Sequence, residues 1–325
     1  YKEVKERSAV VRFKIKGEEG YFLAWTTTPW TLPSNVALCV HPDLEYAKVK
    51  AADGNLYILA VARLDAVLSG LAKEGEEAYS ILETCKGKDL VGLSYEPLYD
   101  GAEKEAEKQH KKAHIVVSDH YVSADDGTGI VHIAPAFGED DGRIGRENDL
   151  ALVKFVDSEG KLTAETPFFG MRCKPTEKEV AEGAISADPE VLKDLEKRGL
   201  LFDAPKFEHS YPHCWRCGTP LIYYARESWF IKMTAVRDEL VANNNTVNWI
   251  PESIGKGRFG DWIENVQDWS LSRDRYWGTP LNIWECKDCG EQEAIGSIKE
   301  LSERADNYQE VLSKLKAEGE KGYSS

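Results

Sequence analysis

Two C-x-x-C pairs carry the clearest chemical signal in this sequence of 325 residues. They are Cys214 with Cys217 and Cys286 with Cys289, and a glycine follows each pair directly. This spacing allows two thiolates to bind one tetrahedral Zn²⁺ ion from a tight turn, so the pairs are candidate ligands of structural zinc. Unrelated buried thiols are the alternative, and a thioredoxin-like redox pair fits two such turns poorly. The 68 residues between the pairs exceed the usual zinc-ribbon spacing, so a single site shared by all four cysteines stays open.

A group of hydroxyl side chains follows the apolar run at residues 21–25. Its members are Thr26, Thr27, Thr28 and Thr31. Pro29 lies among them and Pro33 follows them, and both prolines stiffen the backbone and cannot donate to a strand ladder. Three consecutive threonines therefore present hydroxyls on both faces of the chain, where they could hydrogen-bond a substrate or a water. The simpler explanation is that these β-favouring residues end a strand.

A second group combines a histidine with a carboxylate. Residues 127–141 have the sequence GTGIVHIAPAFGEDD. A strand over residues 130–133 would project His132 opposite its apolar neighbours, and a helix opened by Gly138 would carry Asp141 in its first turn. An acidic first turn ordinarily complements the helix dipole, and a lone strand histidine is usually structural. Neither feature indicates a site by itself.

Other catalytic motifs fail. Residues 255–260 fit G-x-G-x-x-G, but they follow residues 248–251 rather than a clean strand, and no βαβ unit surrounds them. The sequence contains no P-loop, no G-x-S-x-G elbow and no H-E-x-x-H motif. A covalent hydrolase is therefore not supported.

The elements that must position these groups are short strands with helices between them. We expect strands over residues 9–16, 21–25, 36–40, 47–50, 56–59 and 130–133, and helices over residues 60–71, 138–148 and 188–199. Thr176 and Glu179 have the spacing of a capping box, and Asp188 followed by Pro189 is a good N-cap and N1 pair. This pattern predicts an α+β barrel rather than alternating βαβ units.

Composition limits the class of protein. The net charge of −15 argues against strong autonomous binding of nucleic acid. No run approaches 18 uninterrupted apolar residues, so we expect no membrane span. An odd number of cysteines, seven, with knuckle-like spacing indicates a reducing compartment, and we expect a cytoplasmic location.

The chain is long enough for two domains. Seven of the nine tryptophans lie beyond residue 205, so we place a boundary there, between residues 1–205 and residues 206–325. We expect an exposed acidic helix over residues 286–325. Neither an initiator methionine nor a signal peptide opens the sequence, which predicts a piece of a longer protein.

Four segments in the same order together resemble the isoleucyl-tRNA synthetase family across essentially the whole chain. They are residues 25–35, 127–141, 213–217 and 269–281. Valyl and leucyl relatives are similar, but they usually carry arginine at the position of Thr28 and an acidic residue at that of Trp30. The family signatures H-I-G-H and K-M-S-K-S are absent from this sequence, so we expect neither aminoacylation nor use of ATP or magnesium here.

The resemblance implies an editing domain. Residues 1–205 would form a β-barrel with peripheral helices, and residues 206–325 a partial zinc-bearing helical connector toward a Rossmann-type core that is incomplete in this chain. The implied reaction is hydrolysis of the ester of Val-tRNA(Ile). Isoleucine against valine is the standard case in which one methylene yields only about 1–3 kcal/mol of discrimination, so a second, hydrolytic site is needed.

Family roles transfer to named positions by resemblance. Asp141 would bind the α-ammonium group of the substrate, and His132 would line the side-chain pocket and exclude isoleucine. Hydrogen bonds to substrate and water would come from Thr26, Thr27 and Thr28, with Trp30, Thr31 and Asn35 near the substrate. The resemblance implies no covalent nucleophile: water would attack the ester.

The resemblance also bears on partners and zinc. Each cysteine pair would be half of a structural zinc site whose other half lies outside this segment, and His213 could be recruited as a ligand. The expected partners are the valine-charged 3′ end of tRNA(Ile) and the rest of the synthetase, with the chain as a monomer. Two alternatives remain: an editing segment of a valyl or leucyl relative, and a non-catalytic zinc scaffold that docks tRNA.

Overall fold

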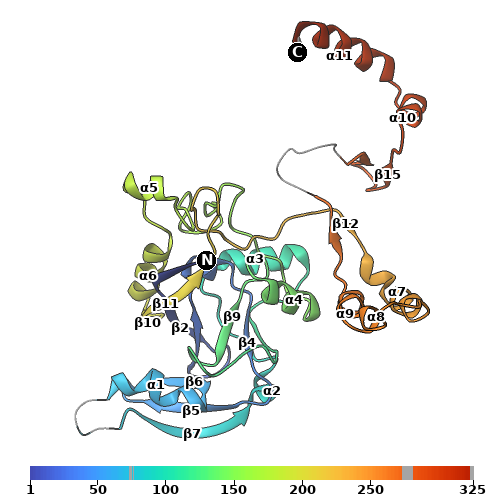
Figure 1. The fold of residues 1–325 in the computed structure, drawn as a ribbon. Helices are drawn as coiled ribbons and strands as arrows, with labels where there is room; N and C mark the ends of the chain where they lie inside the picture. Colours follow the sequence, from blue (N-terminus) through green and yellow to red (C-terminus); the bar gives the residue numbers. More distant parts are fainter. Residues whose placement is uncertain (73–74, 76, 273–280, 323–325) are drawn as a thin grey trace. The chain divides into compact units, whose positions relative to one another are not determined.

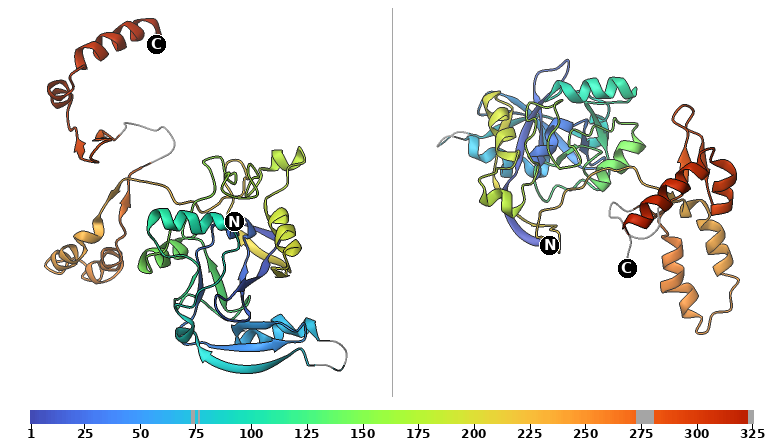
Figure 2. Two further views of the ribbon diagram at one scale, coloured as in Figure 1. Left: turned by 180° about the vertical axis from the view of Figure 1, so that it is seen from behind. Right: turned by 90° about the horizontal axis from the view of Figure 1, so that it is seen from above.

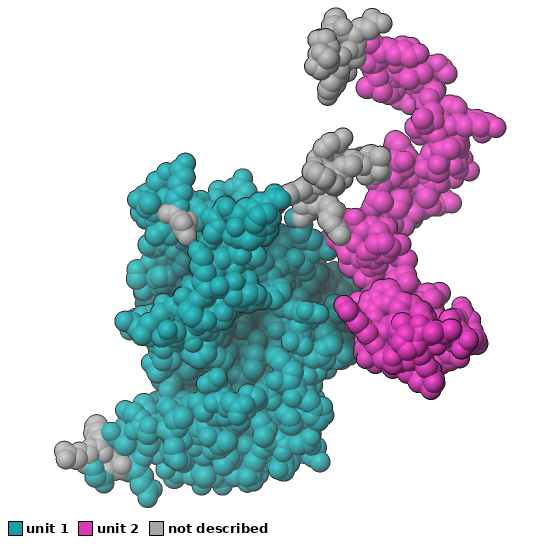
Figure 3. All heavy atoms as spheres, in the orientation of Figure 1, with its two compact units in different colours: residues 1–226 teal, residues 227–325 magenta. Residues whose placement is uncertain are grey.

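The computed structural model describes residues 1–72, 75, 77–272 and 281–322. The chain divides into two units, Tyr1–Arg226 and Glu227–Ser325 (Figure 3). The strand β11 (Lys206–Tyr211) lies in the first unit, where it pairs antiparallel with β1 (Lys2–Arg7). The units thus change after residue 226, later than the change of composition near residue 205. Of the family-like segment 269–281, residues 273–280 lie outside the described residues.

Among the described residues, a nine-stranded mixed sheet forms the centre of the first unit, and Figure 1 shows that it curls. Its order is β7-β5-β6-β3-β9-β4-β8, with β2 paired to β3 and β10 paired to β2. The strands are β2 (Ala9–Lys14), β3 (Tyr21–Thr26), β4 (Ala37–Val40), β5 (Glu45–Ala51), β6 (Leu56–Ala60), β7 (Tyr79–Lys86), β8 (Ile115–Ser118), β9 (Ile130–Ile133) and β10 (Leu201–Asp203). The predicted α+β class is confirmed.

Short helices connect these strands. They are η1 (Pro29–Ser34), η2 (Val61–Arg63), α1 (Leu64–Leu68), η3 (Ser69–Leu71), α2 (Gly87–Leu90), α3 (Asp100–Gln109), α4 (Glu139–Glu147), α5 (Glu177–Ala181) and α6 (Asp188–Lys197). The helix predicted over residues 60–71 is reduced to α1 with a 3-10 turn on each side. In the described part of the chain, no helix combines the length and apolar character needed to cross a membrane.

The helix termini test two local predictions. The capping box is confirmed: the Glu179 amide donates to Thr176 Oγ1 at 3.2 Å, and the Thr176 amide donates to the Glu179 carboxylate at 2.8 Å. The N-cap prediction for Asp188 is wrong, because Ala187 occupies that position and Asp188 is the first helical residue. The Asp188 carboxylate instead accepts hydrogen bonds from distant groups, which are described with the site below.

The two faces of the sheet bury different clusters of apolar side chains, since neighbours along a strand point in opposite directions. In β4, Leu38 belongs to one cluster and Cys39 to the other. α3 and α4 cover the cluster of Cys39, to which they contribute Ala106 and Ile144 (Figure 2). α6 packs on the cluster of Leu38 through Val191 and its neighbours. Both faces of the central strands are therefore buried.

The second unit has small elements. They are β12 (Phe230–Ile231), η4 (Met233–Ala235), α7 (Arg237–Asn244), α8 (Ser253–Lys256), α9 (Arg258–Glu264), β13 (Trp269–Ser270), β14 (Ile283–Glu285), β15 (Gln292–Ala294), α10 (Ile298–Arg304) and α11 (Tyr308–Gly322). The single acidic helix predicted over residues 286–325 is wrong. A turn that contains Gly290 at φ 72° joins β14 to β15, and two separate helices follow this hairpin.

Close packing accounts for glycines in the G-x-G-x-x-G sequence. A Cβ atom on Gly255 would lie 2.1 Å from Cδ1 of Trp249, and one on Gly260 would lie 2.4 Å from the carbonyl oxygen of Gly255. A larger side chain at Gly255 would displace Trp249, and one at Gly260 would separate α9 from α8. Close packing therefore explains why these two positions are glycine, and a phosphate-binding role is not needed to account for them.

Gly129 and Gly17 offer a matched test of packing in the first unit. Both have positive φ, 74° and 81°, so alanine is strained at either position. At Gly129 the new Cβ would also lie 2.4 Å from Cβ of Ala60, whereas at Gly17 no atom lies within 4 Å. We expect Gly129→Ala to lower the free energy of unfolding in urea by about 1–3 kcal/mol more than Gly17→Ala does. Equal losses would contradict this account of the packing.

Candidate active site

The carboxyl ends of two parallel strands bring the predicted site segments together. β3 pairs with β9 through Trp25 opposite Val131, and on its other side β9 places His132 opposite Leu38 of β4. β3 ends at Thr26 and β9 at Ile133, so both chains leave the sheet at the same edge. The edge where parallel strands end is a common place for ligand sites in α/β sheets. The threonines and His132 therefore share one edge of the sheet.

The threonine segment turns sharply after β3. The Thr28 amide donates to Thr26 Oγ1 at 3.1 Å, and the Thr31 hydroxyl donates to the Thr28 carbonyl oxygen at 2.8 Å. The hydroxyl oxygen of Thr28 lies 3.4 Å from those of both Thr26 and Thr31. Thr26 and Thr31 are buried, whereas Thr27 and Thr28 are half-buried. Thr27 and Thr28 are thus the partly exposed members of this group.

A chain of hydrogen bonds fixes the His132 ring. Tyr95 donates to Asn35 Oδ1 at 2.6 Å, which assigns the orientation of the amide, and Asn35 Nδ2 then donates to the Ala37 carbonyl oxygen. The same Nδ2 group lies 3.1 Å from His132 Nδ1 and donates to it. The ring proton of His132 is thereby assigned to Nε2, which donates to Thr31 Oγ1 at 2.7 Å.

This network makes His132 a fixed, neutral group. Burial lowers the pKa of His132 to about 4, so the imidazole is uncharged near neutral pH. Both ring nitrogens are occupied by protein partners, Asn35 and Thr31. The side chain therefore offers neither a free base nor a free metal ligand, and it can act on a ligand through its shape.

Asp141 lies beside the end of β9. It is in the first turn of α4, and its Oδ2 atom accepts a hydrogen bond from the Ala134 amide at 2.8 Å. Burial raises the pKa of Asp141 to about 6, and the negative charge of Asp140 adds to this shift. Among the described residues, no cationic side chain forms an ion pair with Asp141. A desolvated carboxylate without a cation is suited to bind one.

Gly138 leaves room for that carboxylate. A Cβ atom on Gly138 would lie 2.9 Å from Asp141 Oδ1 and 3.0 Å from its Cγ. Its backbone is extended, with φ −157°, so the requirement for glycine is the close approach and not the conformation. Sequence reasoning noticed Gly138 only as the start of a helix.

A buried ionic cluster holds the segment that contains Trp30. The Trp30 amide donates to Asp188 at 2.9 Å, and Lys174 Nζ lies 3.2 Å from Asp188 and 2.7 Å from Glu6. The indole of Trp30 is 2% exposed and packs edge-to-face on Phe137 with ring centroids 5.1 Å apart. The side chain of Trp30 thus lies in the core, where it anchors η1. Sequence reasoning missed Lys174 and Glu6, and no local pattern marks them.

Each cysteine pair lies in its own hydrogen-bonded turn, which we call a knuckle. In the first, the Cys214 amide donates to Thr219 and the Gly218 amide donates to Cys214, and in the second Cys286 and Gly290 repeat this arrangement. The Thr219 hydroxyl, 3.2 Å from the sulfur, lowers the pKa of Cys217 to about 7. Backbone amides of Cys289 and Asp288 lower the pKa of Cys286. The first pair belongs to the first unit and the second pair to the second unit.

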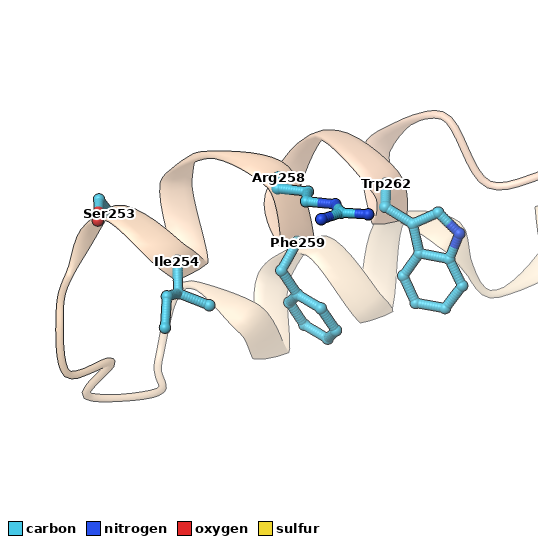
Figure 4. Close-up of a pocket in the computed structure, with 5 residues that line it drawn as sticks. All are labelled: Ser253, Ile254, Arg258, Phe259 and Trp262. Carbon is cyan, nitrogen blue, oxygen red and sulfur yellow. The ribbon is translucent and has the colours of Figure 1, made fainter.

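The second unit contains a hollow of about 520 Å³, shown in Figure 4. Its lining consists of Ser253, Ile254, Arg258, Phe259 and Trp262. This lining contains no carboxylate, imidazole or thiol, and none of the predicted site residues. The edge of the sheet formed by β3 and β9 therefore remains the candidate active site.

Comparison with known proteins assigns a family. The chain matches the family described as "tRNA synthetases class I (I, L, M and V)" over residues 3–321. It is 51% identical to the isoleucine–tRNA ligase of Clostridium novyi over 94% of this chain and 27% of that protein, and 49% identical to that of Clostridium acetobutylicum over 96% and 28%. The chain thus spans about a quarter of the length of these curated relatives.

Solved structures give a weaker likeness. "The crystal structure of GlLeuRS-CP1" is 13% identical with a TM-score of 0.43, covering 62% of this chain and 99% of that one. The editing domain of the cytosolic leucyl-tRNA synthetase of P. knowlesi is 14% identical with a TM-score of 0.42, covering 63% and 97%.

The buried cluster around Lys174 predicts a large effect on stability. Lys174→Met would leave the carboxylates of Glu6 and Asp188 without their cation, and we expect a loss of about 3–5 kcal/mol in the free energy of unfolding. The matched control is Lys193→Met, which removes an exposed pair with Glu190 and should change that free energy by less than about 1 kcal/mol. Urea titrations of both variants measure the difference. Similar losses would show that Lys174 does not hold η1.

Proposed function

Because the chain belongs to the class I tRNA synthetases of the isoleucine, leucine, methionine and valine group, we propose that its first unit hydrolyses the ester of a mischarged tRNA. The observation that carries this proposal is the Asp141 carboxylate, which is desolvated and unpaired among the described residues. It shares the carboxyl-end edge of the sheet with half-buried threonines and a fixed histidine. These groups suit an aminoacyl ester, which has an ammonium group, a carbonyl and a side chain.

Asp141 would bind the α-ammonium group of the ester. A charge-assisted hydrogen bond to a carboxylate out of water is strong, and no lysine or arginine of the described residues competes for it. The Ala134 amide holds Oδ2, which orients the carboxylate, and Oδ1 faces Gly138 where no side chain intervenes. A peptide bond or a free carboxylic acid would not satisfy both the Asp141 carboxylate and the threonine hydroxyls.

The chemical step would use water rather than a protein nucleophile. Water adds to the ester carbonyl, the bond to the ribose oxygen breaks, and the proton released by water ends on that ribose oxygen as a hydroxyl. Thr27 and Thr28 would position the water and the carbonyl through their half-buried hydroxyls, with Thr26 and Thr31 holding the turn. Catalysis would then come from positioning and preorganised hydrogen bonds.

His132 would set the choice of amino acid. Its ring is held at both nitrogens, so it can form a rigid wall that valine clears and isoleucine, longer by one methylene, does not. A wall of this kind discriminates by exclusion, which complements the limited selectivity of a pocket that only attracts. The identity to isoleucine–tRNA ligases supports Val-tRNA(Ile) as the substrate.

The other assignments follow from the same premise. Residues 1–205 would carry editing and residues 206–325 would connect it to the rest of a cytoplasmic, monomeric synthetase. The knuckles fit zinc, since each turns two thiols together and lowers the pKa of one of them, and the ion would hold the knuckle in shape. Two thiols supply half of a tetrahedral site, so the remaining ligands would come from elsewhere in the protein.

Deacylation of Val-tRNA(Ile) by the purified chain tests the role of Asp141. We expect Asp141→Asn to slow the reaction at least tenfold, about what a charge-assisted hydrogen bond of 1.5–3 kcal/mol provides. Asp140→Asn is the matched control, since Asp140 is an exposed neighbour paired with Arg143. Absence of deacylation by the unmutated chain, with tRNA binding intact, would favour the docking scaffold and overturn the proposal.

The same assay has a predicted pH dependence. The pKa of Asp141 is about 6 in the folded chain, so protonation below that pH removes the charge that binds the ammonium group. We expect the rate of the unmutated chain to fall as the pH drops through about 6, and we expect the Asp141→Asn variant to lack this fall. A profile shared by both proteins would remove Asp141 from the step.

Replacement of His132 tests the exclusion of isoleucine. We expect His132→Ala to hydrolyse Ile-tRNA(Ile) and to lower the ratio of the valine rate to the isoleucine rate at least tenfold, because the wall is gone. Retained hydrolysis of Val-tRNA(Ile) shows that the variant is folded. An unchanged ratio in a folded variant would remove His132 from the pocket.

A further inference from the structure

Two neighbouring parallel strands place a pair of histidines at the same end of the sheet. β4 and β8 are parallel, with Val40 opposite Ser118 in their last shared pair. His41 follows β4 directly, and His120 is the second residue after β8. The topology therefore brings the two imidazoles together although they are distant in sequence.

Asp43 completes a group of three potential ligands. One ligand atom from each of His41, Asp43 and His120 lies within 4.8 Å of the others. His120 Nδ1 is 3.7 Å from Asp43 Oδ2, and the two imidazole rings meet edge-to-face with centroids 5.0 Å apart. Within the described residues, this is the single group of three or more histidine, cysteine or carboxylate side chains with such spacing.

Hydrogen bonds hold the loop that follows β4. The His41 amide donates to the Tyr46 hydroxyl at 2.9 Å, and Lys86 Nζ donates to the Asp43 carbonyl oxygen at 3.1 Å. Amides of Gly87 and Lys88 donate to the carbonyl oxygens of the same loop at 3.0 and 3.1 Å. The backbone that carries two of the three groups is therefore already positioned.

The loop that follows β8 is held as firmly. The Asp119 amide donates to the Val40 carbonyl oxygen at 3.0 Å, which ties this loop to the end of β4. The Asp119 carboxylate is engaged by Arg143 at 2.7 and 3.1 Å and by the Tyr121 amide. Asp119 is thus occupied, and Asp43 is left as the carboxylate that faces the two histidines.

We propose that His41, Asp43 and His120 bind a divalent transition-metal ion such as Zn²⁺ or Ni²⁺. Two imidazole nitrogens with one carboxylate oxygen are a donor set that these ions prefer, whereas Ca²⁺ and Mg²⁺ prefer oxygen ligands alone. Side chains of Asp43 and His120 are about three-quarters exposed, so water can fill the remaining positions on the ion. The bound ion ties the loop after β4 to the loop after β8.

Binding exchanges one existing interaction for another. The Asp43 amide donates to His41 Nδ1 at 3.1 Å, and an ion at that nitrogen displaces this hydrogen bond. The exposed side chains also lose conformational freedom on binding. The site is therefore a reversible one, weaker than a cluster of four thiolates, and it is independent of the proposed hydrolysis and of the cysteine pairs.

Calorimetric titration with Ni²⁺ tests the site in the full chain with Cys214, Cys217, Cys286 and Cys289 replaced by serine, which removes competing thiolates. We expect one ion per chain, at least tenfold weaker binding in His120→Ala and in Asp43→Asn, and no change in His110→Asn. His110 is an exposed histidine outside the group, and asparagine suits its left-handed backbone at φ 53°. Unchanged affinity in His120→Ala, or no saturable binding, would overturn the proposal.

A second measurement keeps the cysteines. Ni²⁺ is a paramagnetic ion, and in the unmodified chain it should broaden the imidazole NMR signals of His41 and His120. This broadening should disappear in Asp43→Asn. Broadening confined to His213, next to the first cysteine pair, would place the ion at the knuckle and overturn the proposed site.

Discussion

The parallel pairing of β3 with β9 is the constraint on which the candidate site depends. It involves Trp25 opposite Val131, close to the carboxyl ends of both strands. Because both strands run in the same direction, the threonine turn and the segment that leads to Asp141 leave the sheet together. An antiparallel arrangement would send them to opposite edges. The register also matters, because a shift of one residue would turn His132 to the other face.

The polar side chains around His132 are buried and hydrogen-bonded to one another, and this explains how the protein tolerates them. Tyr95, Asn35, His132 and Thr31 form one directed series of hydrogen bonds, and neutrality of the imidazole avoids a charge in the interior. The neighbouring cluster is different, because Lys174 is charged and is balanced by carboxylates. A desolvated charge without a cation is costly, so Asp141, which is half-buried and has no ion pair among the described residues, is the group that most needs a ligand.

Local patterns in the sequence were sufficient for elements whose causes are local. The strand at residues 130–133 and the capping box at Thr176 arise from alternation and from contacts three residues apart. The role of Asp188 could not be predicted in this way, because its partner Trp30 is 158 residues away. Similarly, Tyr95 fixes Asn35 from 60 residues away. The site residues were identified by type and resemblance, while their supports required the fold.

The ribbon formed by β1 and β11 sets the distance between the two ends of this part of the chain. Lys2 lies opposite Tyr211 and Arg7 opposite Lys206, so about two hundred residues of chain start and finish as adjacent strands. The two ends of this segment are therefore as close together as the two ends of a simple hairpin turn, although the whole sheet and its helices lie between them in the sequence. The ends of this segment already lie together in the β1–β11 ribbon, and the entropic cost of closing a loop grows only slowly with its length. The part of the chain between the two strands can therefore differ in size while the ribbon stays the same.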